Sequence, residues 1–399
     1  MKETGKTQQL WSWTFIIALI INVFSSVSMY MTNPIMTDCL LEKGVPFAWT
    51  GIISSVISWI SLLFRPVSGW ASDNYNKKRI MLISHGVTAV CMFMYTLAPN
   101  VASILIVRIL HGIAFGFTAT LSLTFAVTFI EKEILAEGLA YLSLGQLLGS
   151  MLGPQVGATI AERFSIRTTF AFSGILSAIA FVLIFLLPYS YVKAEKKQMK
   201  VSIDDLIYRE TIPFMILICI FSIGNSIISY YLKNFGDVRG IANVTLFFMV
   251  NSIAMAAFKP FSSKVHDQKG IAYVMYPSFV VSAISFIVLA HSYTLVPVLL
   301  AAVLKAVSQG VGSPALQAES AKIAGEGKSG AAISTCLSGQ DIGNAIGPVI
   351  GSAVIAQKGY GFTYYALAGL TLLGLAYFIF YYKNTYINKF KVEKEDTNL

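Results

Sequence analysis

The chain has 399 residues, of which 55% are hydrophobic and only 12% are charged, with a formal net charge of +9. A soluble domain carries about a quarter charged residues, so this composition argues against a soluble enzyme. The four cysteines lie far apart and show neither metal-ligand spacing nor a disulfide framework. The sequence contains no phosphate-binding loop, zinc-type histidine spacing or nucleophile elbow. We therefore expect no enzyme, no cofactor and no metal site.

The hydrophobic residues form blocks of about 20, which is the length of a helix that crosses a bilayer. Twelve such blocks follow one another along the chain: 10–32, 47–71, 80–98, 101–125, 136–161, 168–189, 211–233, 241–264, 271–291, 294–317, 330–356 and 361–382. The first block is too long for a signal peptide and leads directly into the next. The sequence thus predicts an all-α membrane protein with 12 transmembrane helices.

The orientation follows from the 29 lysines and arginines. Nineteen of them fall in segments on the same side of the membrane as the N-terminus. Six fall on the other side, namely Lys43, Arg163, Arg167, Lys233, Arg239 and Lys358, and four fall within spans, namely Arg65, Arg108, Lys259 and Lys305. Because cytoplasmic loops carry the excess of cations, we expect both termini in the cytoplasm. The positive charge then reflects topology, and no nucleic acid partner is expected.

Two motifs recur at one offset of 194 residues. Segment 64–79, FRPVSGWASDNYNKKR, is echoed by 258–267, FKPFSSKVHD, and the Gly-Pro pattern at 145–157 is matched at 339–351. Two unrelated motifs that repeat at one spacing indicate a duplicated half-molecule, as in many transporters. We expect a first bundle at 1–190, a cytoplasmic linker at 191–210, a second bundle at 211–383 and a charged tail at 384–399.

Twelve spans, a central polar loop and two similar halves resemble the major facilitator superfamily of secondary transporters. The resemblance covers essentially the whole chain. It implies two pseudo-symmetric six-helix bundles, a cavity between them that opens to one side at a time, and a protein that works as a monomer in the lipid bilayer.

The family's loop after the second span has Gly, three residues, Asp and then a basic pair four residues beyond. Gly69, Asp73, Lys77 and Lys78 match this pattern, and the resemblance implies that they form a cytoplasmic gate together with Arg79. Asp73 could cap a helix N-terminus, where the dipole favours an anion. Asn76 stands where the family commonly has Gly, and we expect it to replace Gly because Asn tolerates left-handed backbone. The alternative is a plain positively charged anchor.

The fifth span contains Gly145, Gly149, Gly153, Pro154 and Gly157. This pattern resembles the motif that the family associates with exporters, especially proton-coupled drug antiporters, although Ala158 stands where a second Gly is common. Glycines at a spacing of four leave a groove for a neighbouring helix, and the proline bends the span. The alternative reading is helix packing alone.

Three charged residues inside spans are candidates for proton coupling: Asp341, Lys305 and Arg108. Asp341 lies near the middle of the eleventh span, where desolvation favours the protonated carboxyl. Lys305 lies about as deep in the tenth span, so an ion pair between the two could break during transport. Arg108 resembles the family's Arg-x-x-x-Gly segment, and an intramembrane arginine is functional by default. The alternatives are a static buried pair for the first two and a structural clamp for Arg108.

Weaker candidates for a substrate cavity are Asn22, His111, Gln146, Gln309 and Asn344. Each could equally form a hydrogen bond between helices. We expect a bacterial plasma-membrane protein that exports a small organic compound in exchange for protons. A proton-coupled importer of a sugar, nucleoside or organic acid is one alternative, and a non-transporting receptor or scaffold is another. The substrate itself stays open between a cationic drug, a zwitterionic chelator and a sugar derivative.

Overall fold

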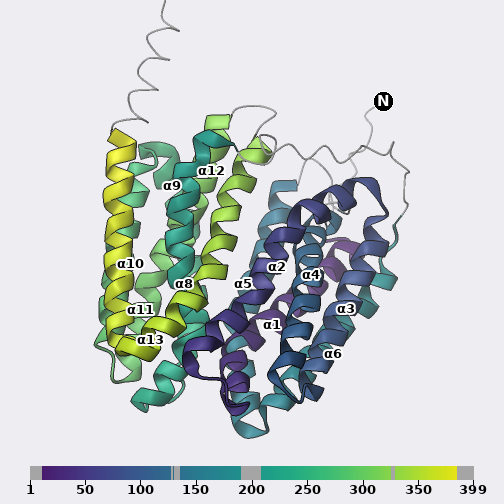
Figure 1. The fold of residues 1–399 in the computed structure, drawn as a ribbon. Helices are drawn as coiled ribbons and strands as arrows, with labels where there is room; N and C mark the ends of the chain where they lie inside the picture. Colours follow the sequence, from purple (N-terminus) through teal and green to yellow (C-terminus); the bar gives the residue numbers. More distant parts are fainter. Residues whose placement is uncertain (1–10, 127–128, 130–134, 190–207, 325–328, 384–399) are drawn as a thin grey trace, which may run out of the picture. The chain divides into compact units, whose positions relative to one another are not determined.

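The computed structural model describes residues 11–126, 129, 135–189, 208–324 and 329–383. These residues form helices joined by short turns, with no β-strand among them (Figure 1). The prediction of an all-α protein is confirmed. Nine helical stretches of the described residues are long and apolar enough to cross a membrane. The last of these, Ser334–Tyr381, counts once although its helix is kinked, and α5 and α9 are not among the nine. The total of twelve spans stays a prediction.

The chain divides into two compact units. Unit 1 comprises Met1–Val45 and Val56–Met199, and unit 2 comprises Pro46–Ser55 and Lys200–Leu399. The first turns of α2 therefore group with unit 2, and the remainder of that helix groups with unit 1. A boundary inside a helix could not be read from composition, because nothing in the sequence interrupts the apolar block there.

Unit 1 contains most of the first six helices, which are α1 (Trp13–Glu42), α2 (Phe47–Asn74), α3 (Lys77–Leu97), α4 (Val101–Ala126), α5 (Leu135–Arg163) and α6 (Ile166–Leu186). Side chains at several starts accept from backbone amides, which is the preferred N-cap arrangement. Ser12 Oγ accepts from the amide of Phe15, and Ser165 Oγ accepts from that of Thr168. In this unit α1 packs on α5 and α6, and α3 packs on α4 and α6.

Unit 2 contains η3 (Arg209–Thr211), α8 (Ile212–Arg239), α9 (Leu246–Lys269), α10 (Ala272–Ala290), α11 (Leu295–Val307), η4 (Ser308–Gly312), α12 (Ser313–Ala324) and α13 (Ser329–Tyr381). A π-helical turn, η4, joins α11 to α12 without a break. Gly359, with φ of +79°, divides α13 into two helices. In this unit α8 packs mainly on α13, and α10 packs on α13 and α11.

We distinguish the two ends of each unit by the direction of its first helix, which is α1 in unit 1 and α8 in unit 2. The near end is where α1 or α8 begins, and the far end is where that helix finishes. On the topology expected from the lysines and arginines, the near end faces the cytoplasm.

At the far end of each unit, a cation at the end of the first helix caps the end of the third helix. At the end of α1, Lys43 Nζ donates to the carbonyl of Ala98, which terminates α3, over 2.6 Å. At the end of α8, Arg239 donates to the carbonyls of Ser292 and Ala290 at the end of α10. Cations satisfy the last carbonyls of a helix and complement its dipole. The two cations lie 196 residues apart and Ala98 and Ser292 lie 194 apart, so the duplication is visible in the contacts themselves.

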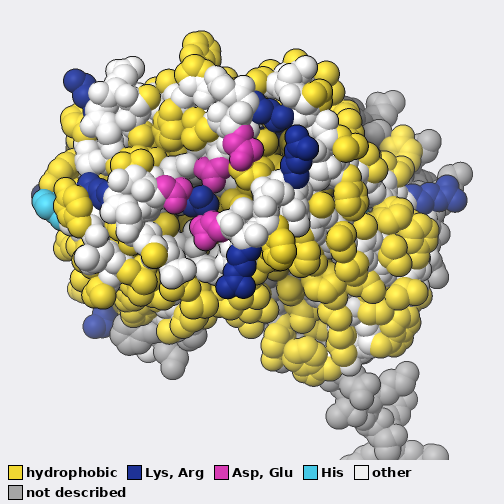
Figure 2. All heavy atoms as spheres, turned by 90° about the horizontal axis from the view of Figure 1, so that it is seen from below, with side chains coloured by type: hydrophobic (Ala, Val, Ile, Leu, Met, Phe, Trp, Pro, Cys, Tyr) yellow, Lys and Arg dark blue, Asp and Glu magenta, His cyan; other side chains and the backbone are white. Residues whose placement is uncertain are grey.

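Both units expose many large hydrophobic side chains, for example Leu97 at 79% and Leu373 at 69%. Hydrophobic side chains cover much of the surface in Figure 2. Helices that satisfy their own backbone groups can present such side chains to lipid without a desolvation cost. The surface is therefore that of a membrane protein.

Candidate functional site

The glycines of the Gly-Pro motif line the seam between α5 and α1. A Cβ atom on Gly145 would lie 2.6 Å from Asn22 Oδ1, and one on Gly153 would lie 2.8 Å from Tyr30 Cβ. Gly149 and Gly157 meet Ser26 and Met31 of α1 even more closely. Because no side chain fits at these positions, the glycines let the two backbones approach, as the spacing of four predicts.

The second copy of the motif builds the same seam in unit 2. A Cβ on Gly343 of α13 would lie 2.5 Å from Ser222 Cβ and 2.6 Å from the carbonyl of Cys219, both on α8. Gly339, Gly347 and Gly351 also meet α8, at Met215, Ser226 and Ile227. The first and fifth helices of each unit are thus held together by equivalent glycines. Such seams allow close packing without long side chains that would have to interdigitate.

Two residues of segment 76–79, at the near end of unit 1, cap helix ends. Asn76 has φ of −64° and ψ of 106°, and its side chain accepts from the amide of Arg79 at the start of α3. The expectation of left-handed backbone at Asn76 was wrong, because the residue serves as an extended N-cap. Lys78 Nζ donates to the carbonyls of Phe185 (3.0 Å) and Leu187 (2.6 Å) at the end of α6.

For the other residues of the expected gate, the structure describes the surroundings of Lys77 and Arg79 but not those of Gly69 and Asp73. Lys77 is half-buried and Arg79 is exposed. The side-chain surroundings of Gly69 and Asp73 lie outside the described part of the chain, as does the side chain of Asp267 in the second copy. The gate function of the five residues stays a prediction, and for Lys78 the described contacts are those of a C-cap in its own unit.

Arg108 belongs to a buried polar group in unit 1. It is 3% exposed, and its Cζ lies 5.8 Å from the centroid of the Tyr95 ring on α3. One turn further along α4, His111 is 2% exposed, and its Nδ1 lies 3.3 Å from the hydroxyl of Tyr95. Phe170 of α6 packs on the same ring, with centroids 5.1 Å apart. The group combines a permanent cation, a titratable imidazole and a phenol in apolar surroundings.

Lys305 occupies the matching place in unit 2. It lies 194 residues after His111, and the helices that carry them begin at Val101 and Leu295, also 194 apart. Lys305 is 1% exposed, and its Nζ donates to Ser282 Oγ over 3.2 Å and lies 4.6 Å from the centroid of the Phe286 ring. Each unit therefore buries a nitrogen-bearing side chain on its fourth helix (α4 or α11), and this side chain contacts a hydroxyl group on the third helix (α3 or α10).

The ion pair expected between Lys305 and Asp341 is not formed among the described residues, since the ammonium is bound to α10 instead. Asp341 is half-buried on α13. It lies two residues from Gly339 and from Gly343, so it is on the opposite side of the helix from the seam with α8. The π-helical turn η4 follows Lys305 within three residues, and such turns are frequent at functional sites. The coupling roles of Asp341, Lys305 and Arg108 stay predictions.

The weaker candidates are scattered. Asn22 is buried against the seam at Gly145, which fits a packing role. Gln146 is exposed and Asn344 is half-buried, while the side chain of Gln309 lies outside the described residues. The described side chains include no group of three or more His, Cys, Asp or Glu that could hold a metal ion.

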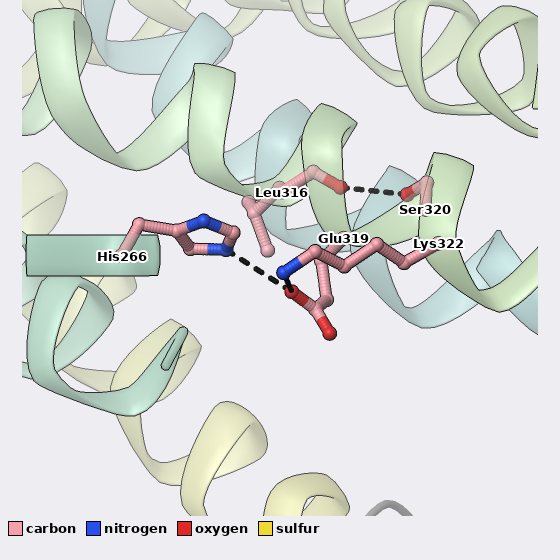
Figure 3. Close-up of polar contacts among 5 residues, drawn as sticks. All are labelled: His266, Leu316, Glu319, Ser320 and Lys322. Atoms are coloured by element: carbon pink, nitrogen blue, oxygen red, sulfur yellow. Dashed lines mark hydrogen bonds and ion pairs between the residues drawn. The ribbon is translucent and has the colours of Figure 1, made fainter. Parts of the chain in front are cut away.

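One buried pair of polar side chains was missed by the sequence analysis. His266 Nε2 of α9 lies 3.0 Å from Glu319 Oε2 of α12, and both side chains are less than 10% exposed. Lys322, one turn further on, lies 3.7 Å from the same carboxylate oxygen, and its side chain is 57% exposed (Figure 3). Glu319 was missed because the tenth span was expected to end at residue 317, whereas α12 continues to Ala324. A carboxylate two residues beyond an expected span and a histidine within the repeated segment 258–267 were the available signals.

Two helical units with equivalent glycine seams and equivalent end caps, membrane-length apolar helices and buried cations define a multi-pass membrane transporter built by duplication. A family model described as "Major Facilitator Superfamily" matches residues 18–303 and again 244–397. The chain therefore belongs to the major facilitator superfamily, and it is a transporter and not an enzyme.

The chain is similar to proteins named "Multidrug resistance protein MdtG". The relative from Klebsiella pneumoniae (strain 342) is 26% identical over 341 residues, which are 82% of each chain. The one from Escherichia coli (strain SMS-3-5 / SECEC) is 24% identical and covers 92% of this chain and 94% of its own. Among solved structures, the nucleoside transporter NupG superposes with a TM-score of 0.72 at 16% identity, over 92% of this chain and 99% of that one. At this identity the structural likeness shows the fold alone.

Proposed function

We propose that this transporter exports a small organic compound from the cytoplasm across a bacterial plasma membrane in exchange for protons. The observation that carries the proposal is the glycine-lined seam between α1 and α5, whose residues Gly145 to Gly157 resemble the exporter motif of the family. The names of the relatives that cover more than four-fifths of the chain, which are multidrug resistance proteins, support the same direction.

In this proposal the protein alternates between a state that is open to the cytoplasm and a state that is open to the outside, and the near ends face the cytoplasm. The segment containing Gly69, Asp73 and Lys77 holds the cytoplasmic side closed during part of the cycle. Both helix seams stay intact throughout, because the glycines bring the backbones into direct contact along the helices. Each unit then moves as a body, which is the expected mode for transporters built from repeats.

Proton coupling is assigned to buried groups that can change charge. Asp341 takes a proton when the site opens to the outside and releases it when the site opens to the cytoplasm. Lys305, in the same unit, responds to the charge of that carboxyl. Its hydrogen bond to Ser282 is weaker than one to a carboxylate would be, because the hydroxyl is neutral, and it can exchange for such a partner during the cycle.

The test uses everted membrane vesicles with an acidic interior and a panel of one cationic dye, one zwitterion and one carboxylic acid. A compound that is exported by proton antiport releases protons from the vesicles. We expect such release with at least one panel member and its loss in Asp341→Asn. The matched control is Glu162→Gln, which changes an exposed carboxylate at the far end of α5 in the same way.

The competing reading is a proton-coupled importer. An importer would move its substrate and protons in the same direction, so a vesicle with an acidic interior would lose both together. Release of protons that accompanies release of preloaded compound would therefore refute export. Proton release that persists in Asp341→Asn would refute the coupling role of this carboxyl.

A further inference from the structure

The guanidinium of Arg108 presents two donors without an acceptor. Nε and Nη2 are both buried, and neither has a hydrogen-bond partner in the part of the chain that the structure describes. These two nitrogens share one edge of the planar group, so their N–H bonds point in nearly the same direction. This edge is the one that binds a carboxylate through two parallel hydrogen bonds.

Arginine keeps its charge under all physiological conditions. A buried cation with unsatisfied donors costs free energy, and that cost is recovered when a hydrogen-bonded anion arrives. The carboxylates that the structure describes in unit 1 are Asp38, Glu42 and Glu162, which lie at the far ends of α1 and α5. None of them accepts from Nε or Nη2. The missing acceptor is therefore expected from outside the described helices.

The surroundings favour a particular kind of anion. The ring of Tyr95 lies under the guanidinium and is itself packed on Phe170. These buried rings make the surroundings of the guanidinium apolar and aromatic. The hydroxyl of Tyr95 also lies 3.3 Å from His111 Nδ1, one turn further along α4, so two further polar groups belong to the same cluster as the arginine.

We infer that Arg108 binds the carboxylate of a transported compound, and that this compound carries an aromatic group beside the carboxylate. The inference rests on the proposed export function for its role in transport, and it specifies the class of substrate. Because Nε and Nη2 are closed off from solvent here, the anion reaches them in a second conformation. An anion that binds only that conformation shifts the protein toward it, so the unsatisfied edge couples substrate binding to movement.

The test measures ligand binding to the purified full-length protein in detergent by thermal unfolding, with benzoate as the probe. Benzamide has the same shape without the charge and serves as the matched ligand. Benzoate should raise the unfolding midpoint of the wild type, and benzamide should not. Arg108→Met should weaken benzoate binding at least about tenfold, since hydrogen bonds to charged groups are worth that much. Arg108→Lys should give an intermediate loss, because an ammonium cannot bind a carboxylate along a planar edge.

The control variant is Arg167→Met, which removes an exposed arginine at the start of α6 and should leave benzoate binding unchanged. Without ligand, Arg108→Met should be at least as stable as the wild type, because it removes a buried cation whose donors are unsatisfied. A markedly lower midpoint in ligand-free Arg108→Met would mean that the arginine is a structural clamp, and would overturn the inference. Equal effects of benzoate and benzamide, or benzoate binding that survives in Arg108→Met, would overturn it as well.

The binding measurement involves no proton gradient, so it separates this inference from the proposed function. Arg108-dependent benzoate binding without any proton-coupled movement would refute antiport and keep the carboxylate site. Proton-coupled export restricted to cationic compounds, with no benzoate binding, would keep antiport and refute the site.

Discussion

The seam between α1 and α5 makes a quantitative prediction for Gly153→Ala. The new methyl group would lie 2.8 Å from Tyr30 Cβ, 2.9 Å from the amide nitrogen of Met31 and 3.0 Å from the carbonyl oxygen of Val27. Two of these three atoms are backbone, so rotating a side chain cannot relieve the contact. The helices must separate by roughly half an ångström, and overpacking of this kind costs about 1–3 kcal/mol.

The same substitution also raises helix propensity, which offsets the packing cost by up to about 1 kcal/mol. Gly369→Ala isolates that second effect, because a Cβ atom there meets nothing within 4 Å. We expect Gly369→Ala to be neutral or slightly stabilising and Gly153→Ala to be destabilising. The difference between the two variants, about 1–3 kcal/mol, is the cost of inserting a methyl group between the two backbones.

The assay is thermal unfolding of both variants and the wild type in the same detergent, followed by circular dichroism. Gly343→Ala in the second seam, where the methyl group would lie 2.6 Å from the carbonyl of Cys219, should behave like Gly153→Ala. If Gly153→Ala and Gly369→Ala unfold at the same temperature, the two helices are not held together by backbone contact and the argument for rigid seams fails.

Three further outcomes follow from single contacts. Lys78→Ala removes the cation that caps α6 and should cost about 0.3–1 kcal/mol in thermal unfolding, whereas Lys358→Ala, at an exposed position, should cost nothing measurable. His266→Ala leaves the buried carboxylate of Glu319 without its nearest partner, although Lys322 remains 3.7 Å away, and should cost about 1–3 kcal/mol; a stability within the error of the wild type would contradict a buried hydrogen bond between the two side chains. Lys305→Met should keep or raise stability while it abolishes compound-dependent proton release in vesicles, and normal proton release in this variant would remove the lysine from the coupling mechanism.

The sequence alone predicted the all-helical class and the duplication of the chain. Apolar blocks of membrane length predict helices, because only a segment that satisfies its own backbone groups can cross lipid. The repeat at 194 residues predicted two similar halves, and the structure shows the same offset in the starts of α4 and α11. The glycine seams were also readable, since a spacing of four places Gly145, Gly149 and Gly153 on one face of a helix whatever surrounds it.

The partners of the charged side chains were decided only by the tertiary structure. Lys78 and Leu187 are 109 residues apart, and His266 and Glu319 are 53 apart. The periodicity of a sequence relates residues within one helix. It does not indicate which helix end the side chain of a lysine or arginine will reach. Charge counting placed Lys43 and Arg239 on one side of the membrane, but packing made them caps of α3 and α10. The unsatisfied edge of Arg108 is likewise a property of the packed unit, because a donor is left without an acceptor only when every neighbour has been placed.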